Sequence, residues 1–296
     1  MGIHIHDLTK DFGNGKGIFD LTFEVKEGEV FGYLGPNGAG KSTTIRHLMG
    51  FMKPSGGTAE INGLDCWKQS AEIQKKVGYL PGEIAFMEGM NGLQFLDLLG
   101  GMRKMKDSSR RDELIGRLQL DAKSPIRKMS KGMKQKLGIV AAFMHDPEIL
   151  ILDEPTSGLD PLMQTVFIDL VLEEKAKGKT VLMSSHSFAE IDRSCDRAGI
   201  IKDGRLVAVE NVHDLRAVQR KIFEVTVKTA DDVESLRESG LEIVDVNGLR
   251  VRISVQGDYE NFIKNLSRCG IQSLDLHTQN LEDIFMHYYD REVTAS

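Results

Sequence analysis

The chain has 296 residues, of which 41% are hydrophobic and 28% charged, and its formal net charge is −6. This length allows a sizeable core and about two domains. The acidic balance argues against a general nucleic-acid binder, because such proteins usually present a basic surface. The three cysteines, Cys66, Cys195 and Cys269, lie far apart and fit a reducing compartment better than a disulfide framework or a zinc site.

Membrane-spanning or secretory segments are not expected. No apolar run approaches the roughly 18 residues that a spanning helix needs, and the first residues lack the apolar core of a signal peptide. We therefore expect the chain to be cytoplasmic, with any role at a membrane depending on a partner protein.

The first elements in chain order are those of a phosphate-binding loop. Residues 3–8 alternate as a strand does, and residues 30–34 form a short apolar run that predicts a buried strand. A glycine-rich stretch interrupts this run, and residues 43–49 then predict a helix. Strand, glycine loop and helix occur in the order that this loop requires.

The middle of the chain predicts a helical insertion followed by further strands and helices. Residues 92–120 are predicted to be helical, with an interruption at Gly100 and Gly101, and a second helix is predicted over residues 131–144. The continuous apolar run at 149–152 is typical of a central parallel strand. Further elements follow: helix 161–176, strand 180–184 and helix 189–195. This alternation favours an α/β core, with a helical subdomain at about 90–145.

After about residue 217 the pattern changes. Residues 223–227 alternate, and Asn247 and Gly248 lie between apolar-rich runs, which is a strong hairpin signal. Short helices are predicted at 231–238 and 259–266, a strand at 271–276 and a last helix at 280–289. The order β-α-β-β-α-β predicts a small ferredoxin-like α+β domain. We therefore expect two domains, 1–220 and 221–296.

The glycine-rich stretch matches the pattern GxxxxGK[ST] at every fixed position. Glycines let successive backbone N–H groups surround phosphate oxygens, and the following helix adds its positive end. Lys41 is expected to reach the β- and γ-phosphates, and the Ser42 hydroxyl to bind Mg²⁺. A plain glycine turn is the alternative, and the strand and helix around it argue against that. The nucleotide-binding residues predicted in this loop are Gly35, Pro36, Asn37, Gly38, Ala39, Gly40, Lys41, Ser42 and Thr43.

Two carboxylates end the apolar run at 149–152. At the carboxyl end of a buried strand, Asp153 is expected to hold Mg²⁺ and Glu154 to polarise the water that attacks the γ-phosphate. A strand that runs into an acidic loop is common, so this interpretation depends on the phosphate loop being present in the same chain.

Three further segments identify a family. Residues 155–160 read Pro-Thr-Ser-Gly-Leu-Asp directly after the two carboxylates, residues 129–133 read Met-Ser-Lys-Gly-Met before them, and His186 follows the strand at 180–184. This ordered set resembles the nucleotide-binding subunits of ABC transporters over residues 1–220. The segment from 221 resembles, less specifically, the accessory domain of bacterial drug and bacteriocin exporter subunits.

The resemblance implies a role for each matching residue. Ser130, Lys131 and Gly132 fall on the signature, which contacts the γ-phosphate bound to the opposite subunit. Asp160 matches the loop that communicates across the dimer. His186 matches the switch histidine and would act in catalysis beside Glu154. Phe12 matches the aromatic side chain that stacks on adenine, which adds it to the nucleotide-binding residues.

Three positions depart from the family pattern. Lys131 and Met133 replace a glycine and a glutamine of the signature, Phe12 stands where tyrosine is common, and Gly82 and Glu83 occupy the stretch where a glutamine is expected. The last departure affects a residue that would contact Mg²⁺ and water. The other lysines near the signature, Lys128, Lys134 and Lys136, are interpreted as a solvated helix face.

The sequence therefore predicts an ATP-hydrolysing subunit, with ATP and Mg²⁺, that energises a membrane transporter, most simply an exporter. The expected partners are a separate membrane-spanning permease and a second copy of an ATP-binding subunit, with no nucleic acid. The chain would be peripheral on the inner face of the membrane. The alternative is a related ATPase that acts on nucleic acid or ribosomes, but the chain has neither a long coiled coil nor a second nucleotide cassette.

Overall fold

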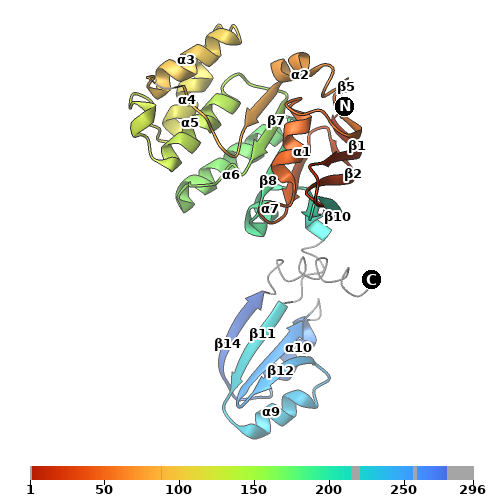
Figure 1. The fold of residues 1–296 in the computed structure, drawn as a ribbon. Helices are drawn as coiled ribbons and strands as arrows, with labels where there is room; N and C mark the ends of the chain where they lie inside the picture. Colours follow the sequence, from red (N-terminus) through yellow and green to blue (C-terminus); the bar gives the residue numbers. More distant parts are fainter. Residues whose placement is uncertain (1, 88, 215–220, 256–258, 279–296) are drawn as a thin grey trace. The chain divides into compact units, whose positions relative to one another are not determined.

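The computed structural model describes residues 2–87, 89–214, 221–255 and 259–278 (Figure 1). The chain divides into two compact units, Met1–Val212 and His213–Ser296. The domain boundary proposed from the sequence, after residue 220, lies a few residues further along the chain. Among the described residues, no helix is both long and apolar enough to cross a lipid bilayer.

A six-stranded sheet with the order β10-β9-β3-β8-β7-β6 forms the centre of the first unit. Its strands pair in parallel except at the β9–β10 edge. Every residue of β3, β7 and β8 is buried, as expected for strands covered on both faces. The strand bounds are β3 Val30–Leu34, β6 Val77–Leu80, β7 Ile149–Asp153, β8 Thr180–Ser185, β9 Arg197–Lys202 and β10 Arg205–Asn211.

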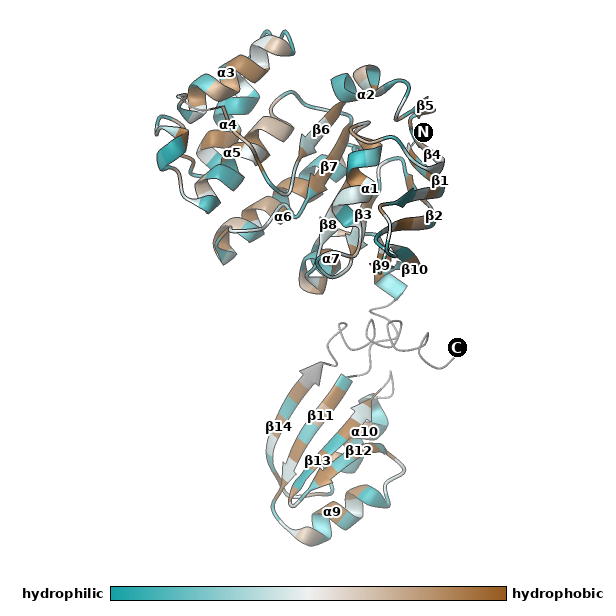
Figure 2. Ribbon diagram, in the orientation of Figure 1, coloured by the Kyte–Doolittle hydropathy of each residue, from teal (hydrophilic) through white to brown (hydrophobic). Residues whose placement is uncertain are grey.

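Helices cover both faces of this sheet, and the ribbon of β7 has the colour of hydrophobic residues (Figure 2). The apolar run of β7 contributes side chains to both buried layers. Ile151 belongs to a buried cluster that contains Ile45, whereas Leu150 and Leu152 belong to another that contains Phe167. Successive side chains of a strand point to opposite faces, so a continuous apolar run supplies both layers. These helices are α1 Lys41–Leu48, α6 Pro161–Ala176 and α7 Phe188–Ser194.

An antiparallel sheet with the order β2-β1-β4-β5 completes the first unit on the side of α1. Its strands are β1 Gly2–Asp11, β2 Gly17–Lys26, β4 Gly56–Ile61 and β5 Leu64–Asp65, and α2 Ser70–Lys76 follows them. Along β2 the buried residues Leu21, Phe23 and Val25 alternate with exposed ones, which is the period of a half-buried strand. The turn between β1 and β2 carries Phe12.

The predicted helical subdomain consists of α3 Gly92–Met102, α4 Ser109–Arg117, a 3₁₀ turn at Ile126–Lys128 and α5 Lys131–Phe143. The predicted interruption at Gly100 and Gly101 is wrong, because α3 runs through both residues and the break follows Met102. A capping box between Asn91 and Gln94 starts this helix. Each glycine costs only about 1 kcal/mol in a helix, which capping and packing outweigh.

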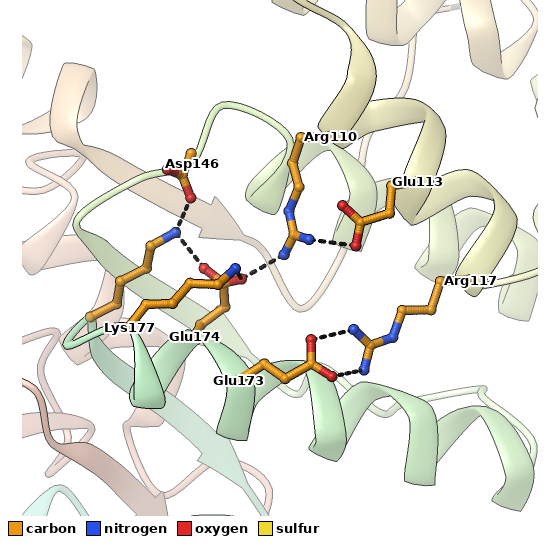
Figure 3. Close-up of polar contacts among 8 residues, drawn as sticks. Arg110, Glu113, Arg117, Asp146, Glu173, Glu174 and Lys177 are labelled. Carbon is orange, nitrogen blue, oxygen red and sulfur yellow. Dashed lines mark hydrogen bonds and ion pairs between the residues drawn. The ribbon is translucent and has the colours of Figure 1, made fainter.

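Ion pairs join α4 to the end of α6 (Figure 3). Arg117 pairs with Glu173, while Arg110, Lys177 and Lys179 all pair with Glu174. The Glu174 side chain is only 2% exposed. A buried carboxylate needs such partners, so this cluster attaches the helical subdomain to the sheet core.

The second unit has a four-stranded sheet with the order β12-β13-β11-β14. Its elements are β11 Lys221–Val227, α9 Ala230–Arg237, β12 Glu242–Asn247, β13 Arg250–Val255, α10 Tyr259–Leu266 and β14 Ile271–Thr278. This is the split β-α-β arrangement that the sequence predicts. Its own core includes Val225, Ile253 and Phe262. The last predicted helix, at 280–289, lies outside the described residues.

Candidate nucleotide-binding and hydrolysis site

Close backbone packing explains the glycines of the phosphate loop between β3 and α1. Gly38 and Gly40 have φ values of 84° and 112°, in the left-handed region that favours glycine. A Cβ added at Gly40 would lie 2.7 Å from the Ile18 side chain, and one at Gly35 would lie 2.4 Å from the carbonyl oxygen of Ile201. The loop therefore requires glycine at these positions, and it leads directly into the N-terminus of α1.

The Lys41 ammonium group lies at the centre of this loop and is almost fully buried. Its Nζ donates to the carbonyl oxygens of Gly35 at 2.6 Å and Pro36 at 3.2 Å. It also forms an ion pair with Glu154 Oε1 at 3.1 Å. An ammonium group has three donors, and all three have an oxygen within reach. A phosphate bound in the loop would compete for this group.

Asp153 ends β7 beside Ser184 of β8. The Ser184 hydroxyl donates to Asp153 Oδ1 at 2.6 Å and accepts from the backbone N–H of Glu154 at 3.0 Å. Asp153 and Ser42 line the same cleft, of about 750 Å³. A carboxylate and a hydroxyl are the hard oxygen ligands that Mg²⁺ prefers, so this pair fits the expected metal.

Glu154 contacts Lys41 and His186, the two other residues expected to act on a γ-phosphate bound to the same chain. Its Oε2 lies 2.6 Å from His186 Nδ1, and its Oε1 faces Lys41. Its φ of 49° is unusual for a residue other than glycine. Strained backbone of this kind persists where surrounding contacts impose it, and it often occurs at functional sites. The carboxylate is thereby aimed into the cleft from the carboxyl end of β7.

A second cleft, of about 570 Å³, extends from the phosphate loop to the β1–β2 turn. Phe12 lines it together with residues of the phosphate loop, including Lys41 and Thr43, and with Glu154. The Phe12 side chain is 54% exposed. An exposed ring beside a phosphate loop offers a flat apolar surface to a base.

The signature residues lie at the start of α5. Ser130 caps this helix by accepting from the backbone N–H of Met133 at 3.2 Å. A Cβ at Gly132 would lie 2.7 Å from the Gly158 carbonyl oxygen, so the helix start packs tightly on the loop that follows Asp153 and Glu154. Lys131 lines the larger cleft, as does Lys134, which the sequence placed on a solvated face.

Asp160 is separate from the two clefts in this chain. It caps α6, where its side chain accepts from the backbone N–H of Met163 at 3.0 Å. Neither Asp160 nor Ser130 is among the residues that line the two clefts. By contrast, Gly82 and Glu83 line the larger cleft with Ser42 and Asp153. Glu83 therefore offers a carboxylate near the place where the family pattern has a glutamine.

Three polar residues that support the site were not predicted. Ser184 contacts both carboxylate residues, and Gln135 of α5 donates to the Glu154 and Pro155 carbonyl oxygens at 3.3 and 2.8 Å. Glu190 of α7 contacts the loop after β7 and the last residue of β8. The only sequence signal was their closeness to a motif: Ser184 precedes His186, and Gln135 follows the signature.

Known proteins resemble this chain in sequence and structure. A profile of the family described as ABC transporter matches residues 18–157. The bacitracin transport ATP-binding protein BcrA of Bacillus licheniformis is 37% identical over 81% of this chain and 79% of that protein. The linearmycin resistance ATP-binding protein LnrL of Bacillus subtilis is 31% identical over 98% of each chain.

A solved structure of the ATP-binding subunit of an ABC transporter is also similar. It has a TM-score of 0.66 and 33% identity, and the match covers 73% of this chain and 92% of that one. The expected fold class is therefore confirmed, including the phosphate-loop core that holds Lys41 and Glu154. The chain belongs to the ABC transporter family and is an ATP-binding, ATP-hydrolysing subunit.

Proposed function

We propose that this subunit powers an exporter whose membrane-spanning part is a separate polypeptide. The similarity to LnrL supports this proposal because it extends over 98% of the chain, including the second unit. The names of two relatives refer to bacitracin transport and linearmycin resistance. A drug, peptide or similar compound is therefore the proposed cargo. Neither relative supports the alternative of an ATPase acting on nucleic acid or ribosomes.

At the site, each residue has a proposed task. The phosphate loop and Lys41 bind the phosphates, and Phe12 stacks on adenine. Ser42 and Asp153 would hold Mg²⁺, which neutralises charge on the transferred phosphoryl group when bound. Glu154 takes the proton of the attacking water, and His186 contacts the γ-phosphate. The observation that carries this assignment is the continuous set of contacts from Lys41 through Glu154 to His186.

A second copy is proposed to complete the site. The exposed start of α5, with Ser130, Lys131 and Gly132, would meet the γ-phosphate held by the partner copy, because a helix N-terminus favours anions. Asp160 would lie at the contact between the copies. If so, ATPase activity per molecule should rise with protein concentration. A constant specific activity over a wide dilution series, with no dimer detected, would exclude the arrangement.

Contact with the permease is proposed at the helical subdomain. Four methionines lie in this subdomain or just before it, Met87, Met90, Met102 and Met105, and each could fill the core or face a membrane partner. Met90 and Met105 pack against the core, whereas Met87 and Met102 are 53% and 71% exposed. The exposed pair would lie at the inner face of the membrane when the subunit is docked.

The direct test is to identify a membrane-spanning protein encoded by a neighbouring gene and to co-express it with this chain. We expect the two to purify together from membranes, and cargo to stimulate ATP hydrolysis by the complex. Replacement of both Met87 and Met102 by Ser should weaken association without changing ATP binding. Failure of the wild-type chain to associate with that protein would contradict the assigned partner.

A further inference from the structure

Glu190 lies in the first turn of α7, directly after the loop that carries His186. No motif of the sequence includes it, and it does not line either cleft of the nucleotide site. Its carboxylate nevertheless contacts the loop after β7 and the last residue of β8, where the two loops that bring proposed catalytic groups to that site begin. One loop follows β7 and carries Glu154, and the other follows β8 and carries His186.

One oxygen of the Glu190 carboxylate accepts from the loop after β7, and the other accepts from the last residue of β8. The Thr156 hydroxyl donates to Oε1, and the Ser185 hydroxyl donates to Oε2 at 2.7 Å. Thr156 is 5% exposed and Ser185 is fully buried. Ser185 also accepts from the backbone N–H of Ser187 at 2.9 Å, so its hydroxyl orients the residues on either side of His186.

The two donors are close in sequence to the groups that would act on ATP. Ser185 directly precedes His186, and Thr156 follows Glu154 by two positions. The Glu154 Oε2 to His186 Nδ1 distance of 2.6 Å therefore depends on the separation of the two loops. An ionised carboxylate only accepts hydrogen bonds, and bonds to it are stronger than neutral ones. With one carboxylate oxygen bonded to each segment, the Glu190 side chain holds the two segments at a fixed separation.

We propose that Glu190 is a positioning residue for ATP hydrolysis: it fixes the separation of the loops that carry Glu154 and His186. The inference rests on the roles of these two residues under the proposed function. It does not concern ATP binding, because Glu190 has no contact with the phosphate loop among the described residues. Misplacement of reacting groups by about 1 Å can lower a rate by roughly a hundredfold.

The test compares E190A and E190Q with R193A, a control on the same helix. Arg193 is exposed, and its contact with Thr165 is long, at 3.5 Å. We expect E190A to lower kcat by about tenfold to a hundredfold, with KM for ATP and nucleotide affinity unchanged. E190Q should recover most of kcat, because an amide can accept from one hydroxyl and donate to the other. R193A should behave like the wild type.

Two further variants keep the test valid if E190A does not fold. T156V and S185A each remove one hydroxyl of the bridge, and each should lower kcat while ATP affinity is retained. The inference is overturned if kcat is unchanged in all the folded variants, or if ATP affinity falls together with kcat. The variant E154Q shows whether the fault lies with the role of Glu190 or with the proposed function. If E154Q also hydrolyses ATP at the wild-type rate, the assignment of Glu154 itself is wrong.

Discussion

Replacing Glu154 by Gln tests the proposed general base. The amide keeps the shape of the side chain but cannot take a proton from water. General-base catalysis contributes about 10²- to 10⁴-fold to a rate, which corresponds to roughly 3–5 kcal/mol at 1.36 kcal/mol per tenfold. We expect E154Q to lose turnover by about this factor. ATP binding should persist or become tighter, because the variant removes the negative charge that lies 3.1 Å from Lys41 Nζ.

The assay measures phosphate release, nucleotide affinity and size-exclusion behaviour with and without MgATP. E154Q should accumulate as an ATP-bound dimer, because closure needs ATP and reopening needs hydrolysis. E148Q is the matched control: it makes the same change at an exposed glutamate directly before β7, at the end of the strand opposite Glu154. Wild-type turnover by E154Q, or an equal loss in E148Q, would refute the assignment.

Four other outcomes are expected. K41A should weaken ATP affinity itself in a nucleotide-binding assay. K131G should weaken ATP-driven dimerisation by about tenfold at low salt, because it removes a charge-assisted contact; unchanged dimerisation would mean that Lys131 faces solvent. E174A should lower the free energy of unfolding by about 1.5–3 kcal/mol in denaturant titrations at neutral pH, because it removes charged hydrogen bonds to a buried carboxylate while Arg110 and Lys179 keep Glu113 and Asp146 as partners. A chain ending at residue 220 should fold and bind ATP; if it folds without binding ATP, the proposed domain division is wrong.

The Glu174 effect should depend on pH. Burial alone would raise the pKa of this carboxyl, but the hydrogen bonds from Lys177 and Lys179 outweigh it and hold the pKa below its ordinary value of 4.5. A lowered folded pKa contributes stability that is present above the unfolded value and is lost as pH falls through the folded one. The difference in stability between wild type and E174Q should therefore shrink in acid, and a difference that stays constant would contradict the ion-pair account.

The phosphate loop and the strand that ends at Asp153 could be predicted because each depends mainly on residues that are adjacent in the sequence. The phosphate loop is contiguous, and the positive φ angles of Gly38 and Gly40 are a property of the loop itself. The apolar run before Asp153 predicts a buried strand whatever lies around it. The β-α-β-β-α-β order of the second unit likewise followed from alternation and from the turn at Asn247 and Gly248.

Long-range contacts could not be predicted in this way. Glu190 and Thr156 are 34 residues apart, and Gln135 and Pro155 are 20 apart. Nothing in composition or spacing indicates that these pairs meet. Strand β2 was not among the predicted elements, although its buried and exposed residues alternate clearly. The continuation of α3 through Gly100 and Gly101 shows tertiary packing overriding a local preference.

Two residues, Glu190 and Gln135, hold the loop after β7, and they connect it to different parts of the first unit. Glu190 links it to the last residue of β8 within the sheet core, whereas Gln135 links the Glu154 and Pro155 carbonyl oxygens to α5 of the helical subdomain. Gln135 is buried, so breaking its bonds would leave a polar group unpaired at a cost of about 1–3 kcal/mol. Movement of α5 would therefore carry the Glu154 backbone with it. Under the proposed function, the start of α5 in one copy meets the ATP bound to the partner copy. Binding of that ATP would therefore act through α5 and Gln135 on the backbone of Glu154 in the first copy.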